Sequence, residues 1–458
     1  MRILYLCSLI CLLLASGCNR IIKPDLERLY ATARSDVRQP PVILIPGIMG
    51  SRLANAEGEE QWIGHLLDAA FSRYEHLALP IDPQTLMPLA DGLQVSGLTD
   101  EFAGRDFYQS ILRVLESAGG YRPAQAGEPA VPGQRSYYVF TYDWRQDNVR
   151  SAQALSQFIE QIRRDHNDPE LMVDIIAHSM GGLITRYYLR YGEQDVLDSN
   201  DFPLTYHGAD KVRRVVLLGT PNLGSVNSLH AFIQGRKVGF RRIPTEVLAT
   251  FPSLYQLFPH PLNDWIINDA GQSLERDLFD VRLWRRFQWS IFDPRVQQRM
   301  VGDLSDPTEA DEHLRLYQDY FARQLERARR FVWSLTVKME RTPWKLVVYG
   351  GDCTLTPARV LVEEVEGASM LRLYPEQISQ PRPGVDYDRL MMFPGDGAVT
   401  KASLLARESL DPFVPRHQYS FFPIDYPIFL CEQHDALTTN AFFQDNLLHF
   451  LLSIDVKQ

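Results

Sequence analysis

The chain of 458 residues is long enough for one large domain with insertions or for two domains. Hydrophobic residues make up 45% of it and aromatic residues 11%, which excludes a disordered chain. Its net charge of −10 argues against non-specific binding to nucleic acid and gives no general attraction to anionic lipid. After the N-terminal leader, no segment approaches the run of about 18 apolar residues that a membrane span needs.

The N-terminus predicts an export signal. Arg2 opens a short basic region, residues 3–14 form an apolar stretch too short to span a membrane, and residues 15–17 are small. Residues 1–17 are therefore interpreted as a signal peptide and excluded from the fold.

A cysteine follows the small residues directly, in an order that resembles a bacterial lipobox. The resemblance implies that Cys18 is acylated and becomes the mature N-terminus, although Ala15 stands where leucine is usual. Asn19 is not the aspartate associated with inner-membrane retention, which favours the outer membrane. We expect an exported, lipid-anchored protein; the alternative is an ordinary cleaved signal peptide.

Residues 18–39 are interpreted as a lipidated N-terminus and linker, with a helical turn or two near residues 26–33. If Cys18 carries lipid, Cys353 and Cys431 remain as a pair. An oxidising compartment allows a disulfide between them. With only two residues to judge from, two separate buried thiols are favoured.

From residue 40 onward, short apolar runs alternate with helical patterns such as 152–163 and 183–191. The runs typical of strands buried on both faces are 42–45, 137–140, 173–177, 215–218 and 346–349. This alternation predicts an α/β fold with a mostly parallel sheet and helices on both faces. Ligands in such folds bind beyond the carboxyl ends of the strands.

Two stretches interrupt the alternation and are interpreted as insertions over the sheet. Residues 54–100 are irregular and lid-like, and residues 225–340 form a helical cap rich in aromatic side chains. The remaining segments, 40–224 and 341–458, supply the two parts of the core. The cap aromatics form either a second core or an acyl-chain pocket, and the sequence does not separate the two.

The segment Ala177-His178-Ser179-Met180-Gly181 lies between an expected strand and an expected helix. Strand, tight turn and helix around a serine predict the nucleophile elbow of α/β-hydrolases. The strained turn needs small residues two positions before and after the serine, which Ala177 and Gly181 provide. Ser179 is the candidate nucleophile, and His178 is expected to be structural.

A serine nucleophile needs a histidine base and an acid that orients it. His434 is the candidate base because it follows the last expected strand, 417–424. The acid has two candidates. Asp352 directly follows the run 346–349, and Asp396 lies in a glycine-flanked loop. Spacing alone does not choose between them.

An oxyanion hole needs two backbone N–H groups directed at the developing charge. Met180, directly after the nucleophile, is expected to supply one. The loop 46–51 follows the first buried strand, and either Ile48 or Met49 is expected to supply the other.

Taken together, the chain resembles the lecithin–cholesterol acyltransferase family, which includes lysosomal phospholipase and phospholipid:diacylglycerol acyltransferase. The matching segments are PVILIPGIMGS (41–51), YDWR (142–145), AHSMGG (177–182), GTPNLGS (219–225), PSLYQL (252–257) and GDGAV (395–399). The resemblance implies that Asp396 is the acid. It also implies a membrane-facing lid around Trp62 and a structural Arg145 that pairs internally.

The chain departs from the family at three points: no loop disulfide is evident near Trp62, Ala398 replaces a threonine, and Ala177 replaces a glycine. None removes a catalytic group, so they bear on substrate choice.

We expect a serine acyl-ester hydrolase or acyltransferase of membrane glycerolipids, with no cofactor and no metal motif. The alternatives are a carboxylesterase for small soluble esters and a catalytically silent lipoprotein that binds without reacting. The oligomeric state stays open.

Overall fold

The computed structural model describes residues 23–35, 39–64, 74–102, 104–239, 241–411, 413–415 and 422–454. The signal peptide expected at 1–17 and the lipidation site expected at Cys18 lie outside these residues. The linker holds the expected helical turns, as α2 (Leu26–Leu29) and a 3₁₀ turn (Ala33–Ser35). No helix in the described part of the chain has the length and apolar character of a membrane span.

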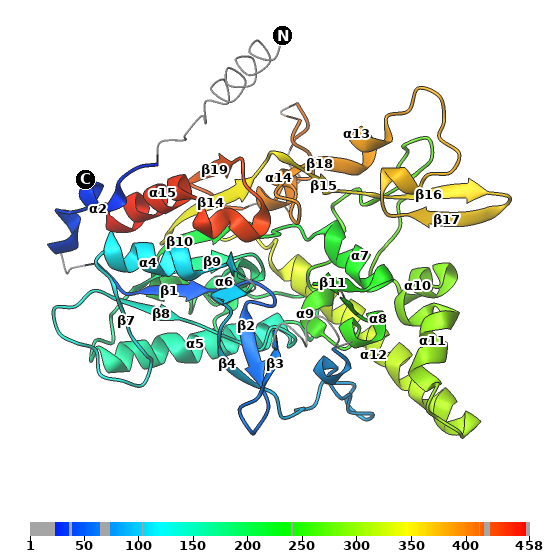
Figure 1. The fold of residues 1–458 in the computed structure, drawn as a ribbon, viewed down its shortest axis with the longest axis horizontal. Helices are drawn as coiled ribbons and strands as arrows, with labels where there is room; N and C mark the ends of the chain where they lie inside the picture. The colour runs from blue at the N-terminus through cyan, green and yellow to red at the C-terminus, as the bar shows by residue number, and fades with distance from the viewer. Residues whose placement is uncertain are drawn as a thin grey trace, which may run out of the picture.

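A parallel sheet, seven-stranded over the described residues, forms the centre of the molecule (Figure 1). Its strands in spatial order are β19 (Tyr426–Leu430), β14 (Lys345–Gly351), β10 (Val212–Leu218), β9 (Val173–His178), β1 (Val42–Ile45), β8 (Ser136–Val139) and β7 (Arg122–Pro123). The predicted α/β architecture is confirmed.

Alternate residues of each strand face opposite helical layers. Val42 and Leu44 of β1 pack toward α4 and α15, whereas Ile43 and Ile45 pack toward α5 and α6. Because both faces are buried, the strands are continuous apolar runs. The covering helices are α4 (Gln109–Ser117), α15 (Ala441–Leu452), α5 (Asn148–Asp165) and α6 (Met180–Tyr191).

The order of the strands places two loops side by side. From β1 the chain continues to β7 and β8 on one side, then crosses to β9 on the other. Ile45 at the end of β1 lies beside Ala177 near the end of β9. The connection after β1 carries α4 on one face of the sheet, and β9 continues into α6 on the other face. A change of face between neighbouring strands is the arrangement that opens a ligand site in α/β sheets.

The last strand lies later than predicted. It was expected at 417–424, but β19 occupies Tyr426–Leu430, and residues 416–421 are outside the described part of the chain. Pro427 weakens the strand signal of this segment. Within the described residues β19 lies at the end of the strand order, beside β14, and proline is tolerated in an edge strand.

The cap expected at 225–340 is mostly helical (Figure 1). It contains α7 (Val226–Gln234), α8 (Thr245–Leu248), α9 (Pro252–Tyr255), α10 (Val281–Phe287), α11 (Pro294–Val301), α12 (Pro307–Ser334), a hairpin of β11 (Arg236–Val238) and β12 (Arg241–Ile243), and β13 (Ile266–Asn268). Its aromatic residues are buried against one another. Trp284 contacts Phe258, Trp289 and Phe321 at ring-centroid distances of 5.0 to 5.8 Å. These residues form a second core.

Smaller sheets complete the fold. The lid-like segment is bounded by an antiparallel sheet of β2 (Ser51–Ala54), β3 (Glu60–Trp62) and β4 (Gln94–Leu98). β13 pairs with β16 (Val360–Val365), which pairs with β17 (Ala368–Arg372); β15 (Thr354–Pro357) pairs with β18 (Met392–Gly395). These last two sheets were not predicted from the sequence.

Cys353 and Cys431 form a disulfide, with their Cα atoms 5.0 Å apart. This is the alternative that the residues alone did not favour. The two cysteines follow the neighbouring parallel strands β14 and β19, so both lie at the same edge of the sheet. That proximity comes from the strand order, and 78 residues separate them in the chain.

Candidate active site

Ser179 lies on the predicted strand–turn–helix, between β9 and α6. Its backbone has φ 53° and ψ −122°, a conformation that non-glycine residues rarely adopt. A Cβ atom at Gly181 would lie 2.6 Å from the carbonyl oxygen of Pro46, so only glycine fits there. This geometry is that of a nucleophile elbow, with the Ser179 hydroxyl at the carboxyl edge of the sheet.

His434 lies within hydrogen-bond distance of both proposed partners. Its Nε2 is 3.0 Å from the Ser179 hydroxyl oxygen, and its Nδ1 is 2.8 Å from Oδ2 of Asp396. A carboxylate only accepts hydrogen bonds, so Nδ1 carries the proton and donates it to Asp396. Nε2 is then free to accept the hydroxyl proton of Ser179.

Asp396 is held in its ionised form by its surroundings. The carboxylate is buried, which by itself would raise its pKa, but the adjacent His434 and the N–H groups of Val399 and Ala398 outweigh burial and hold the pKa below its usual value. The two N–H groups donate to Oδ1 at 2.7 and 2.9 Å. The backbone N–H of His434 also donates to the Asp396 carbonyl oxygen, at 2.9 Å.

The other acid candidate is directed elsewhere. The carboxylate of Asp352 forms an ion pair with Lys401, with Oδ2 and Nζ 2.8 Å apart. Of the two acids that spacing alone left open, the structure therefore brings Asp396 to His434.

The loop after β1 lies directly against the nucleophile. A Cβ atom at Gly47 would be 2.8 Å from the Cβ atom of Ser179. Within the described residues, no acceptor is hydrogen-bonded to the backbone N–H of Ile48, Met49 or Met180. Ile48 and Met49 also line the cavity in front of Ser179. Unpaired N–H groups beside the nucleophile are what an oxyanion hole requires.

His178 connects this loop to His434. The Tyr108 hydroxyl accepts from the Gly47 N–H at 2.9 Å and lies 2.8 Å from Nδ1 of His178. The Nε2 of His178 is 3.2 Å from the carbonyl oxygen of His434 and must be the protonated nitrogen, because a carbonyl only accepts. Burial and the neighbouring His434 lower the pKa of His178 to about 3, so the ring stays neutral. The structural role expected for His178 is thereby explained.

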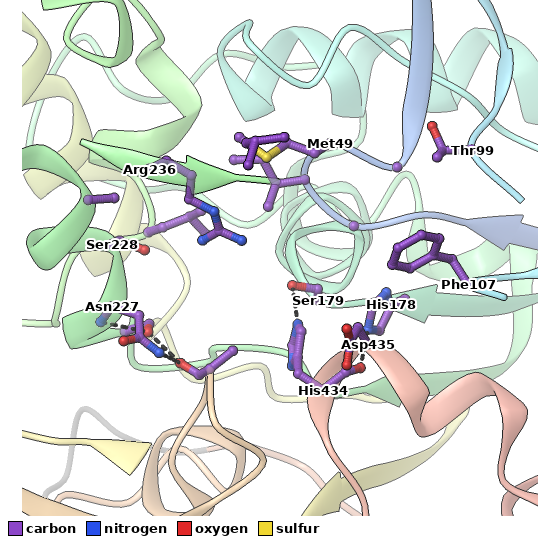
Figure 2. Close-up of a pocket in the computed structure, with 18 of the residues that line it drawn as sticks. Met49, Thr99, Phe107, His178, Ser179, Asn227, Ser228, Arg236, His434 and Asp435 are labelled. Atoms are coloured by element: carbon purple, nitrogen blue, oxygen red, sulfur yellow. Dashed lines mark hydrogen bonds between the residues drawn. The ribbon is translucent and has the colours of Figure 1, made fainter. Parts of the chain in front are cut away.

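A cavity of about 460 Å³ opens in front of Ser179 and His434 (Figure 2). Its wall is largely apolar, and the apolar side chains include Ile48, Met49, Phe102, Phe107, Leu248, Leu254 and Leu257. The cap contributes leucines to this wall, while its aromatic residues fill the second core. Of the two roles left open for the cap aromatics, the second core is the one that they fill.

The stretch around Trp62 was expected to form a membrane-facing lid; within it, Trp62 itself is buried, with 2% of its surface exposed. It lines the cavity from within, and its Nε1–H donates to the Met49 carbonyl oxygen at 3.0 Å. Its ring packs edge-on against Trp144, with centroids 5.2 Å apart. The Trp62 ring thus packs in the apolar interior, while its N–H group holds the loop after β1 through Met49. Arg145 pairs internally with Asp91 and Asp143, as expected.

Residues 131–356 match the lecithin:cholesterol acyltransferase family. The match confirms the resemblance. The family range contains Ser179 and ends before Asp396 and His434, which the fold brings to the serine. No curated protein matches the chain.

Among solved structures, a chain of the Tle4–Tli4 complex is 16% identical, covers 91% of this chain and 98% of its own, and gives a TM-score of 0.54. The Staphylococcus hyicus lipase is 12% identical over 94% of this chain and 96% of its own (TM-score 0.36). The mature Bacillus licheniformis lipase BlEst2 is 11% identical over 92% and 94% (TM-score 0.34). The chain has the α/β-hydrolase fold.

Two features of the site were not predicted from the sequence. Tyr108 carries no motif, and only the fold brings it to His178. The cations Arg236 and Lys237 line the cavity from the β11–β12 hairpin. Their signal was present in the sequence, because residues 236–242 contain four basic residues among seven.

Proposed function

We propose that this chain is a serine-dependent hydrolase or acyltransferase of lipid acyl esters that works through an acyl-Ser179 intermediate. The observation that carries the proposal is the hydrogen-bonded series Ser179–His434–Asp396 at the wall of an apolar cavity. The family match supports the class of reaction, since lecithin:cholesterol acyltransferase is by name an acyl-transfer enzyme.

In the first half-reaction, the Ser179 oxygen attacks the ester carbonyl carbon while its proton passes to Nε2 of His434. Asp396 stabilises the imidazolium that forms. The N–H groups of Met180 and of Ile48 or Met49 hold the negative oxygen of the tetrahedral intermediate. The intermediate collapses, the alcohol leaves with the proton from His434, and the acyl chain remains on Ser179.

In the second half-reaction, water or an alcohol attacks the acyl-serine with His434 as base, and the same steps in reverse release the product. Water gives a free fatty acid, and a lipid alcohol gives a new ester. An apolar cavity of this size suits an acyl chain better than a small soluble ester.

We further propose that the chain acts at a membrane to which it is attached through Cys18, after export from the cell interior. The lipobox-like order of residues 15–18 supports this. Changing Cys18 to Ala should release the protein into the soluble fraction. Persistent membrane binding of that variant would contradict the anchor.

The test of activity uses the chain from Asn19 onward, added to liposomes of phospholipid, diacylglycerol and sterol, with Ser179→Ala as control. Mass spectrometry reads the lipid products. We expect Ser179-dependent fatty acid and lysophospholipid for hydrolysis, or triacylglycerol or sterol ester for acyl transfer. Cleavage of soluble esters alone would favour the carboxylesterase, and no Ser179-dependent product would favour the silent binder.

A further inference from the structure

Two positively charged side chains lie at the entrance of the cavity in front of Ser179. Arg236 and Lys237 belong to β11 and are exposed, and both line the cavity. Figure 2 shows the Arg236 side chain extending from the hairpin into the space in front of Ser179. Neither side chain has a hydrogen-bond or ion-pair partner within the described part of the chain.

The remaining charges of the cavity wall cancel. Arg105 and Asp435 also line it, and they pair with each other, with Nη1 and Oδ2 2.8 Å apart. Within the described residues, the wall therefore offers no unpaired carboxylate. The chain as a whole carries ten more acidic than basic residues. The two unpaired cations make this side of the cavity entrance positive, whereas the chain as a whole is negative.

The hairpin is held in a defined place relative to the triad. It follows directly from α7, whose first turn is bound to the loop that carries Asp396. The Ser225 hydroxyl donates to the Ala398 carbonyl oxygen at 2.6 Å, and the Asn227 amide donates to that of Gly397 at 2.7 Å. The cations and the acid loop are therefore linked through one short helix.

We propose that Arg236 and Lys237 form a subsite for the phosphodiester of a glycerophospholipid whose headgroup carries a net negative charge. The inference rests on the proposed function. An arginine binds phosphate oxygens through two parallel N–H donors, and a lysine adds a second positive charge. In a glycerophospholipid, the phosphate and the acyl esters share one glycerol, so an ester at Ser179 brings the phosphate to the entrance of the cavity.

Because the described cavity wall has no unpaired carboxylate, it should favour phospholipids whose headgroup carries no positive charge. A zwitterionic headgroup carries an ammonium group that would face Arg236 and Lys237 without an anionic partner, and like charges at close range oppose binding. A headgroup such as glycerol carries no such charge. We therefore expect a higher kcat/KM for phosphatidylglycerol than for phosphatidylcholine. We also expect it to be higher than for diacylglycerol, which has no phosphate.

The test uses dihexanoyl lipids below their critical micelle concentrations, so that no charged surface contributes. The substrates are dihexanoyl phosphatidylglycerol, dihexanoyl phosphatidylcholine and dihexanoylglycerol, and kcat/KM is measured for each. We expect wild type to favour the anionic substrate over the other two by about tenfold. In the variant Arg236→Gln/Lys237→Gln, the ratio of kcat/KM between anionic and uncharged substrate should fall about tenfold. Arg236→Lys should retain part of the preference.

Arg122→Gln is the matched control. Arg122 is an exposed arginine on the two-residue strand β7 and does not line the cavity. This variant should keep the wild-type ratio. Reaction of Ser179 with a fluorophosphonate confirms that each variant is folded at the site.

Equal ratios in wild type and the double variant would overturn the subsite and leave the proposed function standing. Equal rates on the zwitterionic and anionic substrates would overturn the charge preference. The same three headgroup types are also assayed as long-chain lipids in vesicles; a preference there that the monomeric lipids lack would overturn the subsite in favour of surface attraction. Absence of any Ser179-dependent cleavage would overturn the proposed function itself.

Discussion

The residues around Ser179 combine strain with close contact. A non-glycine residue at φ 53° costs about 1–3 kcal/mol, which the surrounding structure must offset. The Ser179 N–H donates to the Leu218 carbonyl oxygen at 2.8 Å and so fixes the turn between two central strands. Gly47 and Gly181 then let the first loop approach the serine. The contacts that strain the backbone at Ser179 are therefore the same ones that hold its hydroxyl in the site.

The two acids of the site give a matched pair of variants. Asp396→Asn removes the charge that orients His434 and stabilises its protonated form, so kcat should fall by roughly 10³–10⁴. Asp352→Asn removes only a partly exposed ion pair with Lys401, worth about 0–1 kcal/mol, and should lower kcat less than about tenfold. Steady-state hydrolysis of one ester by both variants makes the comparison. Equal losses would contradict the assignment.

Tyr108 should act on turnover through the loop that it holds. Tyr108→Phe leaves the Gly47 N–H and Nδ1 of His178 without a partner, at a cost of about 1–3 kcal/mol. We expect kcat to fall about tenfold with little change in KM, because losing the hydrogen bond to Gly47 displaces the loop 46–51, which supplies an N–H group of the oxyanion hole. Tyr137→Phe is the control, since its hydroxyl bonds to Glu116, away from the cavity. An unchanged kcat for Tyr108→Phe would rule out this role.

At the scale of elements, the central strands and the elbow could be predicted because their signals are local. A strand buried on both faces is an apolar run, and an elbow needs small residues at fixed positions. Contacts between distant segments could not be predicted in this way. The choice of Asp396 over Asp352 came from family resemblance, and the fold explains it because the Asp352 side chain turns to Lys401. The disulfide and the Tyr108–His178 contact join segments 78 and 70 residues apart.

The disulfide should support both the fold and the loop that carries His434. Cys431 lies three residues before His434 and is tied to the end of β14 through Cys353. Changing both cysteines to serine should lower the free energy of unfolding by about 2–4 kcal/mol, because the unfolded chain regains the freedom of a long loop. It should also lower kcat. Urea unfolding and ester hydrolysis measure the two effects.

Reduction of the wild type gives an independent control for this prediction. Dithiothreitol should reproduce the losses of Cys353→Ser/Cys431→Ser in wild type and leave that variant unaffected. Equal unfolding free energies with and without the reductant in wild type would contradict a stabilising disulfide.

At the scale of the whole molecule, buried histidines link stability to pH. Burial lowers the pKa of His230 to about 4 and contributes, with His434, to lowering that of His178 to about 3. Each folded-state pKa lies below that of the unfolded chain, near 6.5. The unfolded chain therefore takes up protons first, so stability is full above pH 6.5 and falls as the pH drops toward these values.

His230 allows this to be tested away from the catalytic residues. It lies on α7 with 2% of its surface exposed, and its ring packs edge-on against Tyr374. His230→Phe keeps the ring contact and removes the titration. Between pH 7.5 and pH 5.0, we expect the variant to lose about 2 kcal/mol less unfolding free energy than wild type. Urea unfolding at the two pH values measures the difference, and equal losses would exclude His230 as a source of it.

Covalent labelling shows whether Ser179 is an activated nucleophile. The chain from Asn19 onward is treated with a fluorophosphonate, and the adduct is located by peptide mass spectrometry. We expect one adduct, on Ser179, which is absent from Ser179→Ala and forms far more slowly in His434→Ala, since the histidine takes the hydroxyl proton. An unlabelled Ser179, or labelling that does not depend on His434, would contradict the assignment of Ser179 as an activated nucleophile.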